Sequence, residues 1–300
     1  MENRWNCRVN RPAGTLGTGL MLSILIVNWN TKDQLRACLA SIRRFPPGEP
    51  HEVIVVDNAS ADGSAGMVAS EFPSVKLIEP GRNTGYAGGN NLAFTEASGE
   101  WLLTLNPDTE FEDGSIQMAL NELRVKKNHA AVGIRLVGRD GKRQRSVRGF
   151  PTPANVFGAI FGRGRGYSLP DFNYKQPGEA PQPMGTFLMF RREALVAVGD
   201  PKAPFDERFP IFFNDVDLLK RLSDAGWPCW YSSAAHVLHW HGASTSQAGK
   251  SMIWESHNSL VRYFVKHLRW PGRILIPAIA LASFVAAFAK AKGYHAGFRP

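Results

Sequence analysis

The sequence predicts an α/β protein with a mostly parallel, Rossmann-like central sheet flanked by helices, because short apolar runs alternate with amphipathic runs through its first half. The apolar runs are rich in β-branched residues, as expected for strands that are buried on both faces. The amphipathic runs repeat apolar residues at helical spacing. Short links between the two kinds of run are typical of βαβ units.

The first strand is expected at 22–28, where the chain reads Leu-Ser-Ile-Leu-Ile-Val-Asn. A helix at 32–43 follows, because Leu35, Leu39 and Ile42 share one helical face. The same alternation continues along the chain. Further strands are expected at 52–57, 75–79, 101–106 and 185–190, and further helices at 64–71, 88–97, 115–127, from Arg191 and at 216–225.

Composition limits the class of protein. The chain has 300 residues, of which 44% are hydrophobic and 20% charged, so it can bury a substantial core and is neither disordered nor fibrous as a whole. Its net charge of +9 favours an anionic partner such as a nucleotide, a nucleic acid or a membrane surface. Three widely spaced cysteines form no disulfide framework or thiolate zinc motif. Basic residues concentrate at 139–148 and after Ser256.

The region 150–183 is rich in Pro and Gly and has no sustained period, so it is expected to be a long loop with a functional role. Residues 1–20 are polar, basic and Gly-rich, and are expected to be a disordered extension.

The uncharged segment 274–289 is shorter than the roughly 20 residues that span a bilayer. Arg269, Arg273 and Trp270 precede it and further lysines follow it, which suits a helix lying in an anionic membrane face. The alternative is a helix packed on the core of the protein itself.

Polar clusters follow the predicted strands at 28–30, 57–60 and 106–108, where parallel sheets bind their ligands. Asp57 and Asp108 can each accept a hydrogen bond from a base, hold a divalent cation, or simply cap a turn. The Gly-rich segment 81–91 opens a helix whose amides can approach an anion. The dinucleotide and P-loop fingerprints are absent from the sequence.

Two later clusters also carry chemistry. Asp215 and Asp217 stand at a helix start, where they can cap the helix or supply a general base. His236, His239 and His241 do not predict a three-histidine zinc site, because in a strand His236 points away from the other two. One of these histidines assisting a metal or a phosphate is the more plausible role.

These motifs, in this order, resemble glycosyltransferase family 2 over residues 22–244, and most closely its rhamnosyltransferase-like branch. The motifs are Val27-Asn28-Trp29-Asn30, Val55-Val56-Asp57-Asn58-Ala59-Ser60, Asn83-Thr84-Gly85-Tyr86-Ala87-Gly88-Gly89-Asn90, Leu105-Asn106-Pro107-Asp108, Phe205-Asp206-Glu207, Asp215-Val216-Asp217-Leu218 and His239-Trp240-His241-Gly242-Ala243-Ser244.

The resemblance implies a GT-A fold, a nucleoside-diphosphate sugar donor, Mg²⁺ or Mn²⁺, and inversion at the anomeric carbon. Asn106 replaces the first acid of the family's D-x-D motif, and Asn214 precedes the base where relatives commonly have Glu. The implied roles are donor nucleotide binding for Asn28, Asn30, Asp57, Ser60, Asn83, Gly85 and Asn106, metal binding for Asp108 and His239, and general-base catalysis for Asp215.

Three parts are therefore expected: the extension 1–20, a catalytic domain 21–249 with a donor half (21–137) and an acceptor half (138–249), and a helical basic and apolar extension at 250–300. The branch suggests rhamnose carried on thymidine diphosphate. The expected acceptor is a saccharide or a lipid-linked saccharide in cell-surface polysaccharide or glycolipid synthesis. The expected place is the cytoplasm, peripheral on the inner face of the cell membrane.

Two other functions remain open from the residues alone. A nucleotidyltransferase that makes nucleotide-sugars has a basic Gly-rich loop after the first strand, where this chain has Asn-Trp-Asn-Thr-Lys. A nucleic-acid-binding protein would account for the positive charge, but no nucleic-acid-binding module is recognisable and no nucleic acid is expected as a partner.

Overall fold

The predicted βαβ units are present in the computed structural model, which describes residues 8–10, 21–160, 166–240 and 249–293. Four parallel strands form the first half of the sheet, and each is followed by a helix. The third helix begins three residues earlier than expected. The strands are β2 (Leu22–Asn28), β3 (His51–Asp57), β4 (Lys76–Glu79) and β5 (Trp101–Leu105), and the helices are α1 (Lys32–Arg44), α2 (Ser64–Glu71), α3 (Gly85–Glu96) and α4 (Ser115–Val125).

The second half of the sheet is mixed. Its elements are β6 (Thr109–Glu110), β7 (Ala131–Val137), β9 (Gly178–Glu179), β11 (Phe187–Arg191), α6 (Arg192–Val196), α7 (Asn214–Asp224) and β12 (Cys229–His239). β11 lies antiparallel between β5 and β7, whereas β12 runs parallel to β7. β7 was not among the strands expected from the sequence. The α/β class is confirmed, and the parallel arrangement holds for β2 to β5.

A short strand corrects one expectation about the N-terminus. Within the extension expected to be disordered, β1 (Arg8–Asn10) pairs antiparallel with β4. β4 would otherwise be the edge of the sheet, and its unpaired backbone groups are satisfied by this pairing. The sheet order is therefore β1-β4-β3-β2-β5-β11-β7-β12-β6, with β9 beside β12. The rest of 1–20 lies outside the described residues.

The region 150–183 is not a featureless loop. It holds α5 (Pro153–Ile160), β9 and β10 (Gln182–Pro183), and β10 pairs with β8 (Val147–Arg148), which lies just before the region. These elements are short and are stabilised by contacts with distant parts of the chain, so their sequences show no period. α5, for example, packs against the C-terminal helix.

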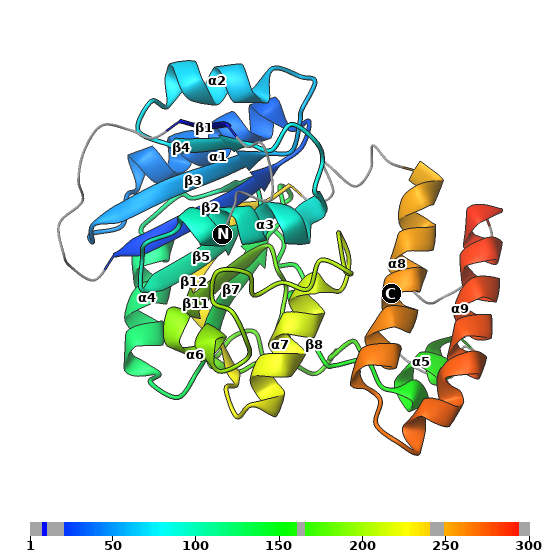
Figure 1. Ribbon diagram of the computed structural model, residues 1–300. Helices are drawn as coiled ribbons and strands as arrows, with labels where there is room; N and C mark the ends of the chain where they lie inside the picture. Colours follow the sequence, from blue (N-terminus) through cyan, green and yellow to red (C-terminus); the bar gives the residue numbers. More distant parts are fainter. Residues whose placement is uncertain (1–7, 11–20, 161–165, 241–248, 294–300) are drawn as a thin grey trace.

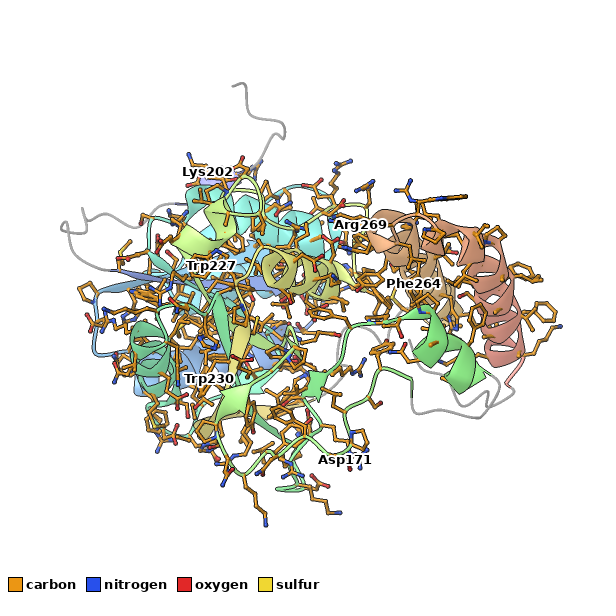
Figure 2. All side chains as sticks on the ribbon, turned by 90° about the horizontal axis from the view of Figure 1, so that it is seen from below. Asp171, Lys202, Trp227, Trp230, Phe264 and Arg269 are labelled. Atoms are coloured by element: carbon orange, nitrogen blue, oxygen red, sulfur yellow. The ribbon has the colours of Figure 1, made fainter. Side chains whose placement is uncertain are left out.

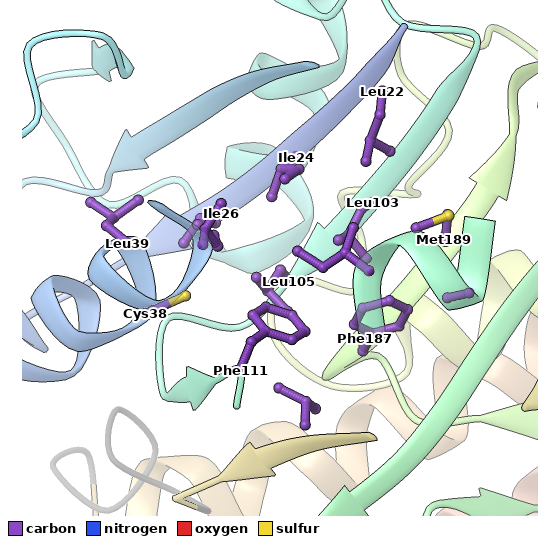
Figure 3. Packing of buried hydrophobic residues seen from close by; sticks show 14 of the residues in the cluster. Leu22, Ile24, Ile26, Cys38, Leu39, Leu103, Leu105, Phe111, Phe187 and Met189 are labelled. Carbon is purple, nitrogen blue, oxygen red and sulfur yellow. The ribbon is translucent and has the colours of Figure 1, made fainter. Parts of the chain in front are cut away.

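Helices cover both faces of the sheet (Figure 1). α1, α2 and α4 pack on one face and α3, α6 and α7 on the other, each with its own apolar cluster. Figure 3 shows the first cluster, in which Ile24 and Ile26 of β2 meet Leu103 of β5 and Leu39 of α1. This packing fixes the strand register and, with it, the edge where the polar clusters lie.

The C-terminal region is helical, as predicted, and comprises α8 (Gly249–His267), the 3₁₀ helix η2 (Gly272–Leu275) and α9 (Ile276–Ala291). With α5, these helices form a group beside the sheet layers (Figures 1 and 2). A third apolar cluster joins them to α7. It contains Val216 of α7, Phe213 directly before α7, and Tyr263 and Phe264 of α8.

An ion cluster also joins α7 to α8. The side chain of Asp217 is fully buried and contacts Lys266 Nζ at 2.6 Å, His267 Nε2 at 2.8 Å and Arg221 Nε at 3.0 Å. Burial alone would raise the pKa of Asp217, but the hydrogen bond with His267 and the charges of Arg221 and Lys266 outweigh burial and lower it. Lys266 Nζ also contacts Asp206 at 2.7 Å.

α9 leaves much of its apolar surface exposed. Exposed fractions are 67% for Leu281, 58% for Phe284 and Val285, and 51% for Phe288. In the described part of the chain, one helical stretch, Gly272–Ala291, is long and apolar enough by length and composition to cross a membrane, and 22% of its most apolar window is buried inside the protein.

We expect Asp217→Asn to lower the free energy of unfolding by about 3 kcal/mol at neutral pH, because it leaves buried cations without their carboxylate. Urea unfolding measures this change. Asp224→Asn, which alters an exposed pair with Lys220 at the other end of α7, should change stability by about 1 kcal/mol or less. Because the pKa of Asp217 is lowered, its contribution should disappear as pH falls through that pKa. Equal effects of the two substitutions would contradict this role of the cluster.

Candidate active site

The carboxyl ends of β2, β3 and β5 meet at one edge of the sheet. Asn28, the last residue of β2, lies directly opposite Asp57, the last residue of β3. On the other side of β2, Ile26 is paired with Leu105, so Asn106 follows at the same edge. The predicted convergence of the three polar clusters is therefore present.

A buried hydrogen-bond network connects two of these strand ends. Asn28 Nδ2 donates to Asp57 Oδ1 at 2.8 Å, and Ser60 Oγ donates to the same oxygen at 2.6 Å. The amide of Ser60 donates to Asp57 Oδ2 at 3.1 Å. Ser60 Oγ also accepts the amide of Asn30 at 2.9 Å. Four of the expected donor-binding residues thus form one connected unit.

Backbone strain marks the same edge. Asn30 and Ala59 have φ angles of 51° and 57°, in the left-handed region that residues with a Cβ seldom adopt. Asn30 is held there by its side chain, whose Oδ1 accepts the amide of Ala61 at 2.7 Å. Strained backbone of this kind persists where surrounding contacts over-determine it, and it is concentrated at binding sites.

The amides of the Gly-rich segment were expected to approach an anion, but at the start of α3 they bond to the protein itself. The amide of Gly85 donates to Asn83 Oδ1 at 2.8 Å, and the amides of Tyr86 and Ala87 donate to the carbonyl of Pro210 at 2.6 and 3.1 Å. Gly85 has φ +73°, and a Cβ there would lie 2.7 Å from Pro210 O. The start of α3 is thus capped by the protein, while Asn83 stays exposed beside the edge.

Asp108 and His239 form the second part of the site. His239 Nε2 lies 3.6 Å from Asp108 Oδ1, and both side chains are less than a tenth exposed. The backbone joins the two residues as well, because the amide of Trp240 donates to Asp108 O at 2.9 Å. A carboxylate oxygen and an imidazole nitrogen that face each other are a suitable ligand pair for Mn²⁺ or Mg²⁺.

Gln144 determines the tautomer of His239. Its Nε2 donates to the carbonyl of His239 at 3.1 Å, which fixes the orientation of the amide. Its Oε1 then lies 2.8 Å from His239 Nδ1 and can only accept a hydrogen bond, so Nδ1 carries the proton. In the neutral ring, Nε2 is left with its lone pair on the side of Asp108.

The other histidines do not join this pair. His236 lies on the opposite side of β12 from His239, 3.4 Å from Asp113, as the strand alternation predicted. His241 belongs to 241–248, outside the described residues. Among the residues that are described, no three His, Cys, Asp or Glu side chains gather into a metal-binding group. An ion at Asp108 and His239 would need further ligands from substrate or water.

Asp215 stands at the start of α7, half-buried. Its Oδ2 accepts the amide of Gly185 at 3.0 Å and its Oδ1 accepts the amide of Val216 at 2.8 Å. Burial raises the pKa of Asp215 above the usual aspartate range, although these two amides act in the opposite direction. A Cβ at Gly185 would lie 2.9 Å from Asp215 Oδ2, so only glycine allows this contact. Asn214 is buried and donates to Ile211 O.

Tyr86 contacts the backbone of Gly185, the residue whose amide binds Asp215. Its hydroxyl donates to Gly185 O at 3.2 Å. Burial raises the pKa of Tyr86, and the charges of Asp215 and Asp108 act in the same direction. The residues before β11 link the end of β5 to Asp215, because the amide of Asn106 donates to Thr186 O at 3.0 Å and the amide of Gly185 donates to Asp215. No role was expected for Gln144, Tyr86 or Gly185 from the sequence. Gln144 is 95 positions from His239, and no motif links the two residues.

Comparison with known proteins agrees with this geometry. The chain is 28% identical over 269 residues to the N-acetylglucosaminyl-diphospho-decaprenol L-rhamnosyltransferase of Mycobacterium tuberculosis, covering 83% of this chain and 86% of that protein. It is 23% identical over 256 residues to rhamnosyltransferase WbbL of Escherichia coli K12, covering 82% and 93%. Its fold is similar to that of mannosyltransferase PcManGT from Pyrobaculum calidifontis in complex with GDP-Man and Mn²⁺, with a TM-score of 0.57, 16% identity, and coverage of 98% and 80%.

These similarities favour glycosyl transfer over the nucleotidyltransferase and nucleic-acid-binding alternatives. The GT-A fold and the rhamnosyltransferase-like relationship inferred from the motifs are confirmed. Residues 23–199, more than half of the chain, match the family model described as glycosyl transferase family 2. The chain belongs to glycosyltransferase family 2.

Proposed function

We propose that this glycosyltransferase moves a sugar from a nucleoside-diphosphate donor to an acceptor hydroxyl with inversion of the anomeric carbon. The observation that carries the proposal is Asp215, a carboxylate whose pKa is raised and whose position is fixed by two amides. A carboxylate of this kind is suited to take a proton from a hydroxyl group near neutral pH.

The donor side is assigned to the connected edge of β2, β3 and β5. Asp57 is held by Asn28 and Ser60, so it can receive a nucleotide base without reorganisation. Asn30, Asn83, Gly85 and Asn106 are proposed to line the rest of the donor. The mycobacterial relative is named as a rhamnosyltransferase, which supports a nucleoside-diphosphate rhamnose as donor.

The proposed reaction displaces the nucleoside diphosphate in one step. Asp215 removes the proton of the acceptor hydroxyl, the oxygen attacks the anomeric carbon from the face opposite the diphosphate, and the carbon–oxygen bond to the diphosphate breaks. Much of the rate enhancement would come from holding the two substrates in line. The contact between Asp215 and Gly185 keeps the carboxylate in one orientation for this transfer.

A divalent cation fits the Asp108–His239 pair, since an oxygen and a nitrogen ligand face each other at 3.6 Å. Mg²⁺ or Mn²⁺ bound there would supply positive charge to the departing diphosphate. Gln144 holds the imidazole with Nδ1 protonated, so Nε2 is the nitrogen that would bind a metal beside Asp108. The related mannosyltransferase structure contains Mn²⁺, which supports a divalent ion here.

We place the enzyme at the cytoplasmic face of the membrane, with a lipid-linked saccharide as the acceptor. The name of the mycobacterial relative describes such an acceptor. In this chain, the exposed apolar residues of α9 and the basic residues at both of its ends support a peripheral position on an anionic membrane.

Asp215→Asn should lower kcat about 10³-fold, because the base is lost. Donor affinity should stay within about twofold of the wild type, since the donor edge is untouched. Release of nucleoside diphosphate measures the first effect and calorimetric titration of the donor the second. Asp224→Asn, the same chemical change at the other end of α7, serves as the control. Loss of donor binding in Asp215→Asn would show that Asp215 has a structural role.

The pH dependence of kcat/KM provides an independent check on the base. Because burial raises the pKa of Asp215, the proton-accepting form is lost as pH falls through a value above the usual aspartate range. The acid limb of the profile should therefore lie above that range in the wild type. An acid limb at the ordinary aspartate position would contradict the assignment of Asp215 as the base.

Gln144→Met should weaken Mn²⁺ binding about 10- to 100-fold, because both hydrogen bonds that orient His239 are removed. Gln144→Glu keeps an acceptor for Nδ1 and should bind Mn²⁺ more tightly than Gln144→Met. Electron paramagnetic resonance of Mn²⁺ with added nucleoside diphosphate measures the affinity without turnover. Gln176→Met, at an exposed site, is the matched control. Unchanged Mn²⁺ affinity in Gln144→Met would contradict the proposal that Gln144 positions His239 as a ligand.

A further inference from the structure

A basic groove lies where the ends of α7 and α8 meet η2. It has a volume of about 440 Å³. Lys266 and His267 in its wall are already engaged by Asp217, and Asp224 is engaged by Lys220. The charge that the groove offers to a partner therefore comes from Arg269 and Arg273. Its polar and aromatic lining consists of Asp224, Lys266, His267, Arg269, Trp270 and Arg273.

Arg269 and Arg273 are both exposed, and Arg269 is labelled at the end of α8 in Figure 2. Arg273 is partly oriented, because its Nε donates to the carbonyl of Leu268 at 3.0 Å. Guanidinium groups bind phosphate oxygens in a bidentate manner and are weakly hydrated, so they are suited to a phosphate at an interface.

The rim of the groove is apolar. Trp270 is 75% exposed, and Ile274, one residue beyond Arg273, is 67% exposed. From there the exposed face of α9 continues through Leu281 and Phe284. Water-exposed apolar side chains beside arginines are costly for a purely soluble surface but favourable at the boundary between headgroups and acyl chains.

We propose that this groove binds the phosphate of an anionic phospholipid headgroup, with Trp270 and Ile274 entering the membrane interface beside it. The proposal rests on the membrane position proposed above and assigns it a specific contact. The exposed apolar rim favours a lipid over free phosphate or a nucleic acid, because neither of those would cover Trp270 and Ile274.

The groove also sets the distance between the membrane and the reaction. Asp224 in its wall is the last residue of α7, and Asp215 is near the first, about 14 Å away at 1.5 Å per residue. Lys266 and His267 belong both to the groove wall and to the ion cluster around Asp217. A headgroup in the groove would therefore lie on the same rigid unit as the catalytic carboxylate.

The test uses the full-length protein and co-sedimentation with phosphatidylcholine vesicles, with and without phosphatidylglycerol. Arg269→Gln with Arg273→Gln should lower partitioning onto the anionic vesicles roughly 30-fold, since each arginine near such a surface contributes a factor of about five. Binding to neutral vesicles should not change. Replacing both arginines by lysine should restore most of the binding to anionic vesicles.

The matched control is Arg43→Gln with Arg44→Gln on α1, which removes the same charge from two exposed arginines on another helix. This control should bind anionic vesicles as the wild type does. Equal losses in both double variants would reduce the effect to net charge and overturn the groove assignment. Thermal melting of each variant shows whether it is folded.

The remaining outcomes separate the proposals. If the Arg269 and Arg273 variant binds anionic vesicles normally, the headgroup site is wrong while the membrane position stands. If the wild type binds neither kind of vesicle, both are wrong, and transfer to a soluble acceptor still tests the enzymatic function. If the Arg269 and Arg273 substitutions abolish binding of inorganic phosphate but leave binding to anionic vesicles unchanged, the groove is a free-phosphate site and the lipid assignment is overturned.

Discussion

A carboxylate that is fully removed from water needs hydrogen-bonding or oppositely charged partners, and Asp217 has basic residues from two helices as its partners. Lys266 and His267 can reach it only if α8 lies against α7, so the charge requirement fixes how the C-terminal helices attach to the sheet layers. Asp215 is two residues away on the same helix and points in nearly the opposite direction. One buried contact therefore orients both the proposed base and the apolar face of α9.

The donor edge depends on a different kind of constraint. Asn28 and Asp57 are almost completely buried, yet their polar atoms are bonded to one another and to Ser60. Buried polar groups that are satisfied in this way are rigid, because any displacement would leave one of them without a partner. The strained backbone at Asn30 and Ala59 is tolerated for the same reason. The edge is thus rigid in the way that the proposed donor site requires.

The sequence predicted this edge well, because strands and their ends are local patterns and parallel pairing brings the ends together. It did not predict contacts between distant segments that lack a motif. Gln144 meets His239 only because the segment after β7 folds back over β12, and α5 is helical because α9 covers it. From the sequence alone, Asp217 fits a helix cap as well as any other role. Its place in an ion cluster depends on Lys266 and His267 of α8, which are about 50 positions away. The roles of the individual site residues remain proposals.

Gly185 shows how the position of the proposed base depends on a neighbouring residue that has no side chain. A methyl group there would collide with the oxygen of Asp215 that the Gly185 amide binds. A random mutagenesis screen for inactive enzyme should therefore recover substitutions at Gly185 as readily as at the carboxylate itself. Gly185 would be recovered in such a screen because its lack of a side chain leaves room for the Asp215 carboxylate, and not because it takes part in the reaction.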